Sequence, residues 1–385
     1  MRVLFVTHSF PRWSGDVAGD FILRLACALR EAGTNVHVLA PAAKDLAPAD
    51  TIEGVPVRRF RYAPAAWQTL AYTGTMAEQV RHSLTGPLAL AGMLVRGSLA
   101  VRRDVMAFAP TVVHAHWWFP GALLAIGAPR TTRVVTTLHG SDVRLARGAA
   151  WAAPLFRRVI EKSAVVTAVS SWLASEARAM APDLRAAVEP MPVNVELFSP
   201  GGVRQPDRFL FVGRLNAQKG IGILLEALAA TRTGARLDVV GDGPDRVVLE
   251  TRAAALGLAS RLSFHGIQTQ QQLVPLYRAA TAVIVPSEHE GLGLVAVEAQ
   301  LCEAPVIAFR SGGLPDIVQD GTTGVLTPPG DVRALALALD ALLARPDHGA
   351  SLGRAGRLAA LARFTPSLVA TRYRAIYEQA GSRAA

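Results

Sequence analysis

The chain has 385 residues, enough for two domains that each bury a core of normal size. Hydrophobic residues make up 51% of it, charged residues recur throughout, and there are 33 glycines and 24 prolines, which is typical of a globular α/β protein. The net charge is +10, and the longest stretch without a charged residue, 105–129, holds three prolines and two histidines, so it does not predict a membrane span.

The amino terminus and the cysteines indicate a cytoplasmic protein. Residues 1–6 predict a strand at once, so we expect no signal peptide. Cys27 and Cys302 stand in apolar helical patterns, where we expect buried, reduced thiols and neither a disulfide nor a metal site. Residues 1–200 carry 21 basic and 14 acidic side chains (+7), and residues 201–385 carry 19 and 16 (+3). Arginine far outnumbers lysine, which fits a coding bias, and we expect no nucleic-acid partner.

Short β-branched runs alternate with longer helical patterns along nearly the whole chain, which predicts parallel sheets covered on both faces. A division near residues 198–202 predicts two Rossmann-like, doubly wound domains, 1–200 and 201–365, and a last helix over 366–379 has no strand after it. The expected strands are Val3–Val6, Val36–Ala40, Val57–Arg61, Val112–His114, Val134–Leu138, Val165–Val169, Phe209–Val212, Leu237–Val240, Leu262–Phe264, Ala282–Val285, Val306–Ala308 and Val325–Thr327.

Two features of the first domain bear on its contacts with a ligand and with a membrane surface. Gly15 and Gly19 lie in the first strand-to-helix loop, the place where doubly wound sheets usually bind ligands, although a surface loop would also explain them. The stretch 84–103 is apolar and ends in arginines. It predicts either a helix on a membrane surface or, with about twice the weight, a helix packed on the domain with a solvated basic edge.

Histidines also mark the carboxyl ends of strands in the first domain. His139 follows a strand, beside Gly140 and near Asp142, which is a better position for chemistry than a lone histidine usually has. His114 and His116 alternate along another strand. They lack a third ligand at a convincing spacing, so we expect no metal site and place one ring in the core and His116 toward the binding region.

The second domain opens with a strand and a glycine-flanked loop, Gly213 to Gly220, that carries Arg214 and Lys219. Arginine can pair with phosphate oxygens and lysine adds a compact charge, so the two could offset a diphosphate. An ordinary loop with solvated cations is the alternative. The following Gly241-Asp242-Gly243 turn is only a partial dinucleotide fingerprint, and we interpret it as a tight turn at the sheet edge near a nucleotide base.

The most informative segment runs from Pro286 to Ala299 as strand, glycine-bearing turn and helix. Gly291 and Gly293 permit close approach of the backbone, and the helix start directs its amide groups at an anion. Glu298 lies five residues beyond Gly293, about 8 Å along a helix axis, so it projects well away from Glu290. The two acids could therefore grip two ends of an elongated ligand with phosphate in its middle. A nucleotide-sugar has that shape.

Together these motifs resemble a retaining glycosyltransferase of family 4 (glycosyl transferases group 1) along nearly the whole chain. The resemblance implies the GT-B architecture, in which two Rossmann-like domains face a cleft. Residues 1–200 would be the acceptor domain, with a last helix, 366–385, that packs back on it, and 201–365 the donor domain. The motifs that carry the resemblance are the early glycine loop, His139-Gly140-Ser141-Asp142, Gly213-Arg214-Leu215, Lys219-Gly220, Gly241-Asp242-Gly243-Pro244, Phe264-His265-Gly266, the pair Glu290/Glu298, Ser311 to Asp316, and Asp320 to Gly324.

The resemblance also implies roles for single residues. Arg214 and Lys219 would hold the donor diphosphate, Glu298 the ribose and Glu290 a hydroxyl of the donor sugar, while His139 would reach the sugar from the first domain. Further donor contacts would come from Gly15, Gly213, Gly241, Gly243, His265, Gly266, Gly291, Leu292, Gly293 and Leu294, and the acceptor region would include Gly19, His116 and Asp142.

The activity that this implies is transfer of a hexosyl unit from a UDP- or GDP-sugar to a glycan or lipid-linked glycan, in envelope or exopolysaccharide synthesis. The anomeric configuration would be retained without metal or cofactor, and the protein would be cytoplasmic, with peripheral contact to the inner membrane face. Met191 to Asn194 replace the Asn-Gly-Val-Asp of many relatives, and the two early glycines are separated. Both departures leave local donor contacts open.

Three alternatives use the same residues differently. An epimerase would share the architecture, and a non-catalytic nucleotide-sugar-binding partner would keep the fold without the reaction. A glycoside hydrolase that uses Glu290 and Glu298 is less attractive, because its carboxylates must flank one bond and Arg214 and Lys219 would then have no purpose.

Overall fold

The computed structural model describes residues 1–72, 76, 79–80 and 83–382. Residues 383–385 of the predicted last helix therefore lie outside the described part. The chain forms two compact units, which are treated separately below: Met1–Pro192 with Pro366–Ala385, and Val193–Thr365. The predicted division at 200/201 lies a few residues beyond the one in the structure.

An eight-stranded sheet, in the order β3-β4-β2-β1-β5-β6-β7-β8, forms the centre of the first unit in its described part. All of its pairings are parallel except β3 with β4. The predicted strands of this half are present, and two short edge strands, β3 and β8, are additional. The strands are β1 Arg2–Val6, β2 Asn35–Pro41, β3 Ala49–Ile52, β4 Val55–Phe60, β5 Val112–His116, β6 Arg133–Leu138, β7 Val165–Ala168 and β8 Ala186–Val188.

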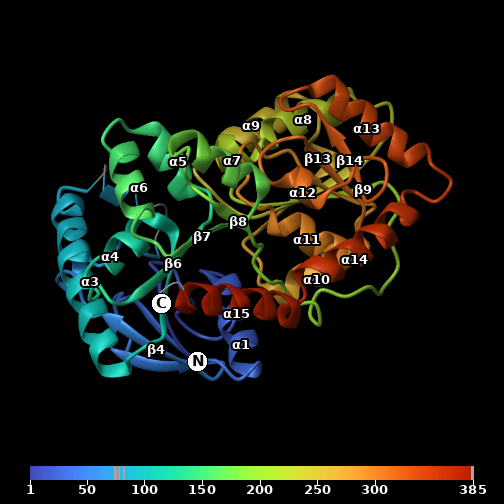
Figure 1. The fold of residues 1–385 in the computed structure, drawn as a ribbon. Coiled ribbons are helices and arrows are strands. Elements are labelled where there is room, and N and C mark those ends of the chain that lie inside the picture. Colours follow the sequence, from blue (N-terminus) through green and yellow to red (C-terminus); the bar gives the residue numbers. More distant parts are fainter. Residues whose placement is uncertain (73–75, 77–78, 81–82, 383–385) are drawn as a thin grey trace. The chain divides into compact units, whose positions relative to one another are not determined.

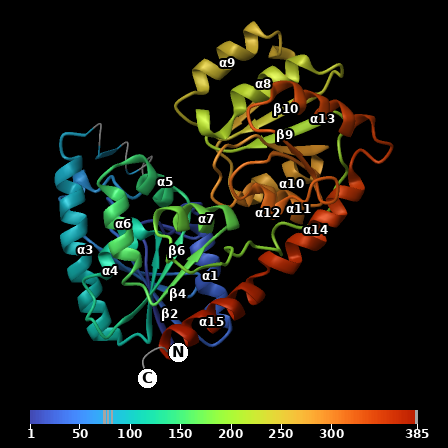
Figure 2. The same cartoon turned by 45° about the horizontal axis from the view of Figure 1, so that its top comes forward.

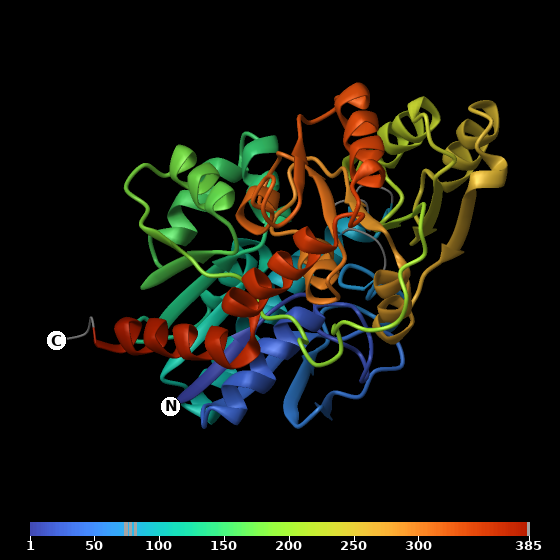
Figure 3. The same cartoon turned by 90° about the vertical axis from the view of Figure 1, so that its right-hand side faces the viewer.

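Helices cover both faces of this sheet. Helix α3 packs on β1, β2 and β4 on one face, whereas α1 and α15 lie together on the other (Figure 2). Figure 3 shows α15 in red alongside α1 in blue, although the two are more than 300 residues apart in the chain. The helices are α1 Asp20–Glu31, η1 Ala65–Trp67, α3 Gly86–Phe108, η2 Trp117–Ala122, α4 Leu123–Ala125, α5 Ser141–Gly148, α6 Ala152–Ile160, α7 Ser171–Met180 and α15 Pro366–Ser382.

The second unit holds an entirely parallel sheet with the order β11-β10-β9-β12-β13-β14. Figure 1 labels β9, β13 and β14 of this sheet. Its strands are β9 Arg208–Val212, β10 Arg236–Val240, β11 Leu262–Gly266, β12 Ala282–Val285, β13 Val306–Phe309 and β14 Val325–Thr327. Its helices are η3 Ala217–Lys219, α8 Ile221–Ala230, α9 Arg246–Ala255, η4 Ala259–Arg261, α10 Gln270–Ala279, α11 Leu294–Leu301, α12 Leu314–Ile317, α13 Val332–Ala344 and α14 Ala350–Phe364.

The strand order locates the site region of each unit. In the second sheet the order reverses between β9 and β12, so the loops that follow these strands leave the same edge on either side of a switch point. In the first sheet the reversal lies between β1 and β5. Both units are therefore doubly wound parallel α/β domains, as the sequence predicts. Within the described residues, no helix combines the length and apolar character needed to cross a bilayer.

Candidate functional site

The loop after β9 is held in a fixed shape by its own residues. Asn216 caps η3 by accepting a hydrogen bond from the Lys219 amide at 3.2 Å. Gly220 follows with φ 68°, and a Cβ at this position would lie 1.9 Å from the Pro286 carbonyl oxygen. Since no side chain fits there, the loop after β9 can pack directly on the segment after β12.

That contact brings together two of the charged residues of the predicted donor site. Lys219 Nζ donates to Glu290 Oε2 at 2.6 Å, and the two side chains are 23% and 17% exposed. The loops are also joined by their backbones, because the Glu288 amide donates to the Gln218 carbonyl at 2.9 Å. Two residues that are 71 positions apart therefore form a partly exposed ion pair at the switch point. Arg214 stands at the start of the same loop and is partly buried.

A third loop fixes the backbone of Glu290. The Gly313 amide donates to the Glu290 carbonyl at 2.8 Å, and Ser311 Oγ accepts from the His289 amide at 3.0 Å. A Cβ on Gly312 would come within 2.3 Å of the Glu290 carbonyl oxygen. The Ser311–Gly313 turn is thus shaped around the backbone of Glu290 and holds it in place.

Helix α11 begins beside this pair. Gly293, with φ 96°, precedes its first residue, Leu294, and a Cβ on Gly293 would lie 3.5 Å from Glu290 Cγ. The start of α11 therefore lies next to Glu290, as a site for an anionic group requires. Gly291 and Leu292 complete the turn, and Leu292 is buried.

Glu298 lies one turn and a half into α11 and has a partner from another helix. Its Oε2 accepts a hydrogen bond from the Tyr277 hydroxyl at 2.7 Å. Tyr277 is fully buried, and burial together with the nearby Glu298 carboxylate raises its pKa well above the usual value. Tyr277 therefore stays a hydrogen-bond donor and orients the carboxylate of Glu298. The sequence did not indicate this contact.

The β10 turn is built against the loop after β9. Gly241 has φ 123°, and a Cβ there would lie 1.9 Å from the Gly213 carbonyl oxygen. A Cβ on Gly243 would lie 2.3 Å from the carbonyl oxygen of Leu215. These glycines are explained by close packing of neighbouring turns at the sheet edge, which agrees with a tight turn better than with a dinucleotide fingerprint.

His265 has a partner of its own on the face of the sheet. Its Nε2 lies 2.7 Å from Asp238 Oδ1, and Asp238 also accepts from Arg208 at the start of β9. Burial raises the pKa of Asp238, but the hydrogen bonds from Arg208 and His265 outweigh it and the net shift is downward. This ion-pair network gives His265 a structural role, whereas Gly266, with φ 66° and open space around it, lies at the strand end.

In the first unit, the two early glycines differ. Gly19 is buried at the start of α1, where a Cβ would lie 2.5 Å from the Ser9 carbonyl oxygen. Gly15 has φ 88° and no heavy atom within 4 Å of a Cβ built on it. The loop is closed by Arg12, whose Nε donates to Asp16 at 2.7 Å. Gly19 therefore serves packing, and only Gly15 leaves open space for a ligand.

His139 is partly exposed and lies against two buried imidazoles. His116 Nδ1 lies 3.1 Å from His139 Nε2, and the ring of His114 lies 4.1 Å from that of His116. His114 is hydrogen-bonded to Thr137 at 2.7 Å and to Tyr377 of α15 at 2.8 Å. Burial lowers the pKa of His114 to about 3, and burial followed by the neighbouring histidines lowers those of His116 and His139 well below 6.5. The rings are therefore neutral at pH 7.

The side chains of His116 and Asp142 are too deeply buried to touch an acceptor directly. His116 is fully buried, and so is His114, so the predicted division into one core ring and one ring at the binding region does not describe them. Asp142 is 2% exposed, and its carboxylate accepts backbone hydrogen bonds from Trp118, Gly140, Val143 and His139. Asp142 thus fixes the turn at Gly140, where φ is 121°, and through it the position of His139.

Comparison with known proteins follows the same division of the chain. The description "Glycosyltransferase Family 4" matches residues 18–197 and "Glycosyl transferases group 1" matches 197–359. D-inositol 3-phosphate glycosyltransferase from Thermobispora bispora is 31% identical over 95% of this chain and 91% of its own length. The chain belongs to the family 4 glycosyltransferases.

Other relatives and solved structures agree with this family. Glycogen synthase from Mycobacterium tuberculosis is 26% identical over 98% of this glycosyltransferase and 94% of its own length. Sucrose-phosphate synthase from Thermosynechococcus elongatus has a TM-score of 0.84 at 22% identity and covers 100% of this chain and 99% of its own. Anabaena HepE in complex with UDP-glucose has a TM-score of 0.71 at 20% identity, with 98% and 99% covered. These neighbours share the GT-B fold.

Sequence reasoning missed several polar residues around the first loop of the glycosyltransferase. Arg59 is 3% exposed and donates to the Pro11 carbonyl at 2.7 Å and to the Tyr72 hydroxyl at 2.9 Å. The Arg12 guanidinium lies over the ring of Trp13, 4.3 Å from its centroid. The clustering of Arg12, Trp13 and Asp16 within five residues was the only signal in the sequence that could have identified them.

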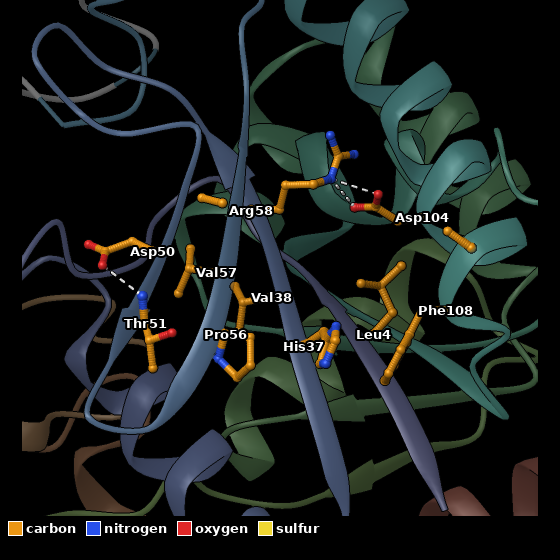
Figure 4. Close-up of a pocket in the computed structure, with 12 residues that line it drawn as sticks. Leu4, His37, Val38, Asp50, Thr51, Pro56, Val57, Arg58, Asp104 and Phe108 are labelled. Atoms are coloured by element: carbon orange, nitrogen blue, oxygen red, sulfur yellow. Dashed lines mark hydrogen bonds and ion pairs between the residues drawn. The ribbon is translucent and has the colours of Figure 1, made fainter.

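A groove of about 750 Å³ in the first unit is lined by none of the predicted donor and acceptor residues. It runs between α3 and strands β2 to β4, where His37 stacks on Phe108 and Arg58 pairs with Asp104 (Figure 4). Since α3 leads into β5, this groove lies at the amino ends of the strands, opposite the edge that carries His139. The convergence of charged loops at Lys219 and Glu290 is a stronger indication of a ligand site than the size of this groove.

The two cysteines are shielded from solvent to different degrees. Cys302 is buried and Cys27 is partly buried, and burial raises the pKa values of their thiols to about 12 and about 11. Among the described residues, no group of three or more histidine, cysteine, aspartate or glutamate side chains could hold a metal ion.

Proposed function

We propose that this glycosyltransferase moves a hexosyl unit from a nucleotide diphosphate sugar to a hydroxyl of a glycan or lipid-linked glycan, with retention at the anomeric carbon. The observation that carries the proposal is the Lys219–Glu290 pair at the switch point, beside Arg214 and the start of α11. A partly exposed cation, a carboxylate and helix amides in one place suit a ligand that joins a phosphate to a sugar.

Each group would have a distinct role. Arg214 and Lys219 would offset the charge of the diphosphate, and the backbone from Gly291 to Leu294 would contact sugar and phosphate. Glu290, freed from Lys219 when the phosphate attracts that ammonium, would accept a hydrogen bond from a sugar hydroxyl. Glu298, oriented by Tyr277, would hold the ribose.

In the transfer step, the acceptor oxygen forms a bond to the anomeric carbon while the bond from that carbon to the phosphate oxygen breaks. The acceptor attacks from the face that the nucleotide leaves, and a phosphate oxygen takes its proton, so configuration is retained. Negative charge grows on the leaving diphosphate, which Arg214 and Lys219 stabilise without a metal ion. His139 is neutral at pH 7 and would donate or accept a hydrogen bond rather than act as an acid.

A UDP-sugar is the first donor to test, because the structural neighbour HepE is in complex with UDP-glucose. GDP-sugars stay in the proposal, since no described contact distinguishes the bases. We further propose that the acceptor belongs to envelope or exopolysaccharide synthesis on the cytoplasmic side of the membrane. That part rests on the family resemblance.

The experiment is a panel of UDP-, GDP-, ADP- and CDP-sugars, each assayed for thermal stabilisation and for slow release of free nucleotide in water. We expect one nucleotide class to raise Tm and to release nucleotide, and release to rise on addition of an acceptor glycan. Stabilisation with no nucleotide release under any condition would indicate the non-catalytic partner. A changed sugar without acceptor would indicate an epimerase.

A further inference from the structure

Helix α3 exposes large apolar side chains to solvent in the first unit. Leu88, Val95, Leu99 and Met106 are 64%, 61%, 63% and 70% exposed. A surface helix normally turns its apolar stripe toward the core and its polar side to water. Here four large apolar residues lie on the solvent side, so this side needs an explanation beyond folding.

The four residues form a line along the helix. Their spacings are seven, four and seven residues, which places them within about 40° of one another around a helix of 3.6 residues per turn. They extend over about 27 Å. We call Leu88, Val95, Leu99 and Met106 the α3 stripe.

The opposite side of α3 is fully used in packing. Met93, Val101 and Val105 are buried, and Gly97 lies so close to Leu124 and Phe60 that a Cβ would come within 3.1 Å of both side chains. Since the helix is already anchored through this side, the α3 stripe is not an inner face left uncovered by chance.

The charges beside the α3 stripe all have one sign. Arg96, Arg102 and Arg103 are exposed on the same side of the helix. The one acidic residue within Gly86–Phe108 is Asp104, which lies on the inner side and pairs with Arg58 (Figure 4). Ile126, 42% exposed, adds apolar surface next to the stripe, because Gly127 packs on the backbone of Ser98.

We propose that the α3 stripe and its three arginines lie on the surface of an anionic lipid bilayer. Apolar side chains in a line, with cations on either side and no exposed carboxylate, match the acyl boundary and the headgroups of such a surface. A second copy of this chain fits less well, because both copies would bring the same exposed arginines to a symmetric contact, with no exposed carboxylate of α3 to pair with them. No helix in the described residues could cross the bilayer. The proposed contact is with the bilayer surface alone.

The test is co-sedimentation of the full chain with vesicles of phosphatidylglycerol and phosphatidylcholine, or of phosphatidylcholine alone, at low salt. The test variant is Leu99→Glu with Arg103→Glu. The matched control, Leu358→Glu with Arg354→Glu on α14, changes an equally spaced, exposed pair of the same residue types by the same charge. Since all four positions are exposed, both variants should keep the wild-type Tm, which is measured alongside.

We expect the wild type to bind the anionic vesicles at least about tenfold more tightly than the neutral ones, and less tightly as salt rises. The test variant should lose at least about tenfold in binding, and the control should keep wild-type binding. Equal binding of the test variant and the control would overturn the proposal. So would absence of binding to the anionic vesicles by the wild type, whether light scattering shows a monomer or a dimer. No donor is present, so the result is independent of the transfer reaction.

Discussion

The two units carry their polar groups at the switch-point edge of similar sheets, but in opposite electrostatic states. In the second unit, Lys219 and Glu290 form a partly exposed ion pair. In the first unit, His114 and His116 are fully buried, and burial lowers their pKa values so that they stay neutral. The second unit thus keeps a charged pair within reach of solvent, whereas the first unit holds these neutral rings in its core.

The largest effect should follow the loss of the charged pair. Lys219→Ala and Glu290→Ala should each lower kcat/KM by at least about tenfold and by about 10² where the contact acts mainly in the transition state. The double variant should lose much less than the product of the two, because the residues contact one another and the same ligand. Steady-state kinetics with Arg354→Ala as the control would check this. Wild-type turnover in either single variant would contradict the site.

A backbone substitution should separate the shape of the second unit from its charge. In Gly241→Ala, the new Cβ would lie 1.9 Å from the Gly213 carbonyl oxygen, at a φ of 123° that alanine avoids. We expect a loss of about 2 kcal/mol or more in the free energy of unfolding, with reduced nucleotide binding. Gly234→Ala, where a Cβ meets nothing within 4 Å, should change stability by less than about 0.5 kcal/mol. Equal stability of the two variants, measured by urea unfolding, would refute the packing role.

The first unit should be the more sensitive one to mild acid. Burial lowers the pKa of His8 to about 4 and of His114 to about 3, so below pH 6.5 the unfolded chain binds protons that the folded unit does not. Stability should therefore be full above pH 6.5 and fall by about 1.4 kcal/mol per pH unit for each such histidine as the pH drops toward 5.

Tryptophan fluorescence can follow the first unit alone, because all six tryptophans of the chain lie within residues 13–172. The denaturant concentration at the unfolding midpoint of this unit should be lower at pH 5 than at pH 7. Circular dichroism, which follows both units, should also show the unfolding of the second unit at a higher denaturant concentration. A fluorescence midpoint that does not move with pH in this range would show that the histidines are not buried and neutral.

The smallest effect should come from chelation. Because Arg214 and Lys219 are proposed to offset the diphosphate, EDTA should leave turnover unchanged. Transfer assays with and without EDTA, at equal ionic strength, would check this. Loss of activity that Mg²⁺ restores would show that a metal ion, in addition to the two basic side chains, offsets the charge of the diphosphate.

The sequence was sufficient where local pattern and topology determine the structure. β-Branched runs identified the central strands, and parallel topology then brought the loops after β9 and β12 to one edge. It missed β3 and β8 because edge strands this short, such as Ala-Asp-Thr-Ile and Ala-Ala-Val, carry little periodic signal. The fold, and the edge of the sheet at which Lys219 and Glu290 lie, could therefore be predicted from the sequence.

Side-chain orientation was not predictable in the same way. His116 and Asp142 follow strands as functional residues often do, but only the packed neighbours show that both are buried. Tyr277 and Glu298 meet from different helices, which no spacing reveals. In α3 both sides are apolar, so the helical pattern could not tell that Met93 points inward and Leu99 outward.

Calorimetric titration tests most directly whether Lys219 binds the donor diphosphate. The nucleoside diphosphate selected by the donor panel would be titrated into the wild type, Lys219→Ala and the control Arg354→Ala. We predict that Lys219→Ala binds at least about tenfold more weakly, since it loses a charge-assisted phosphate contact, while the control binds as the wild type does. Equal affinity in all three proteins would contradict the account.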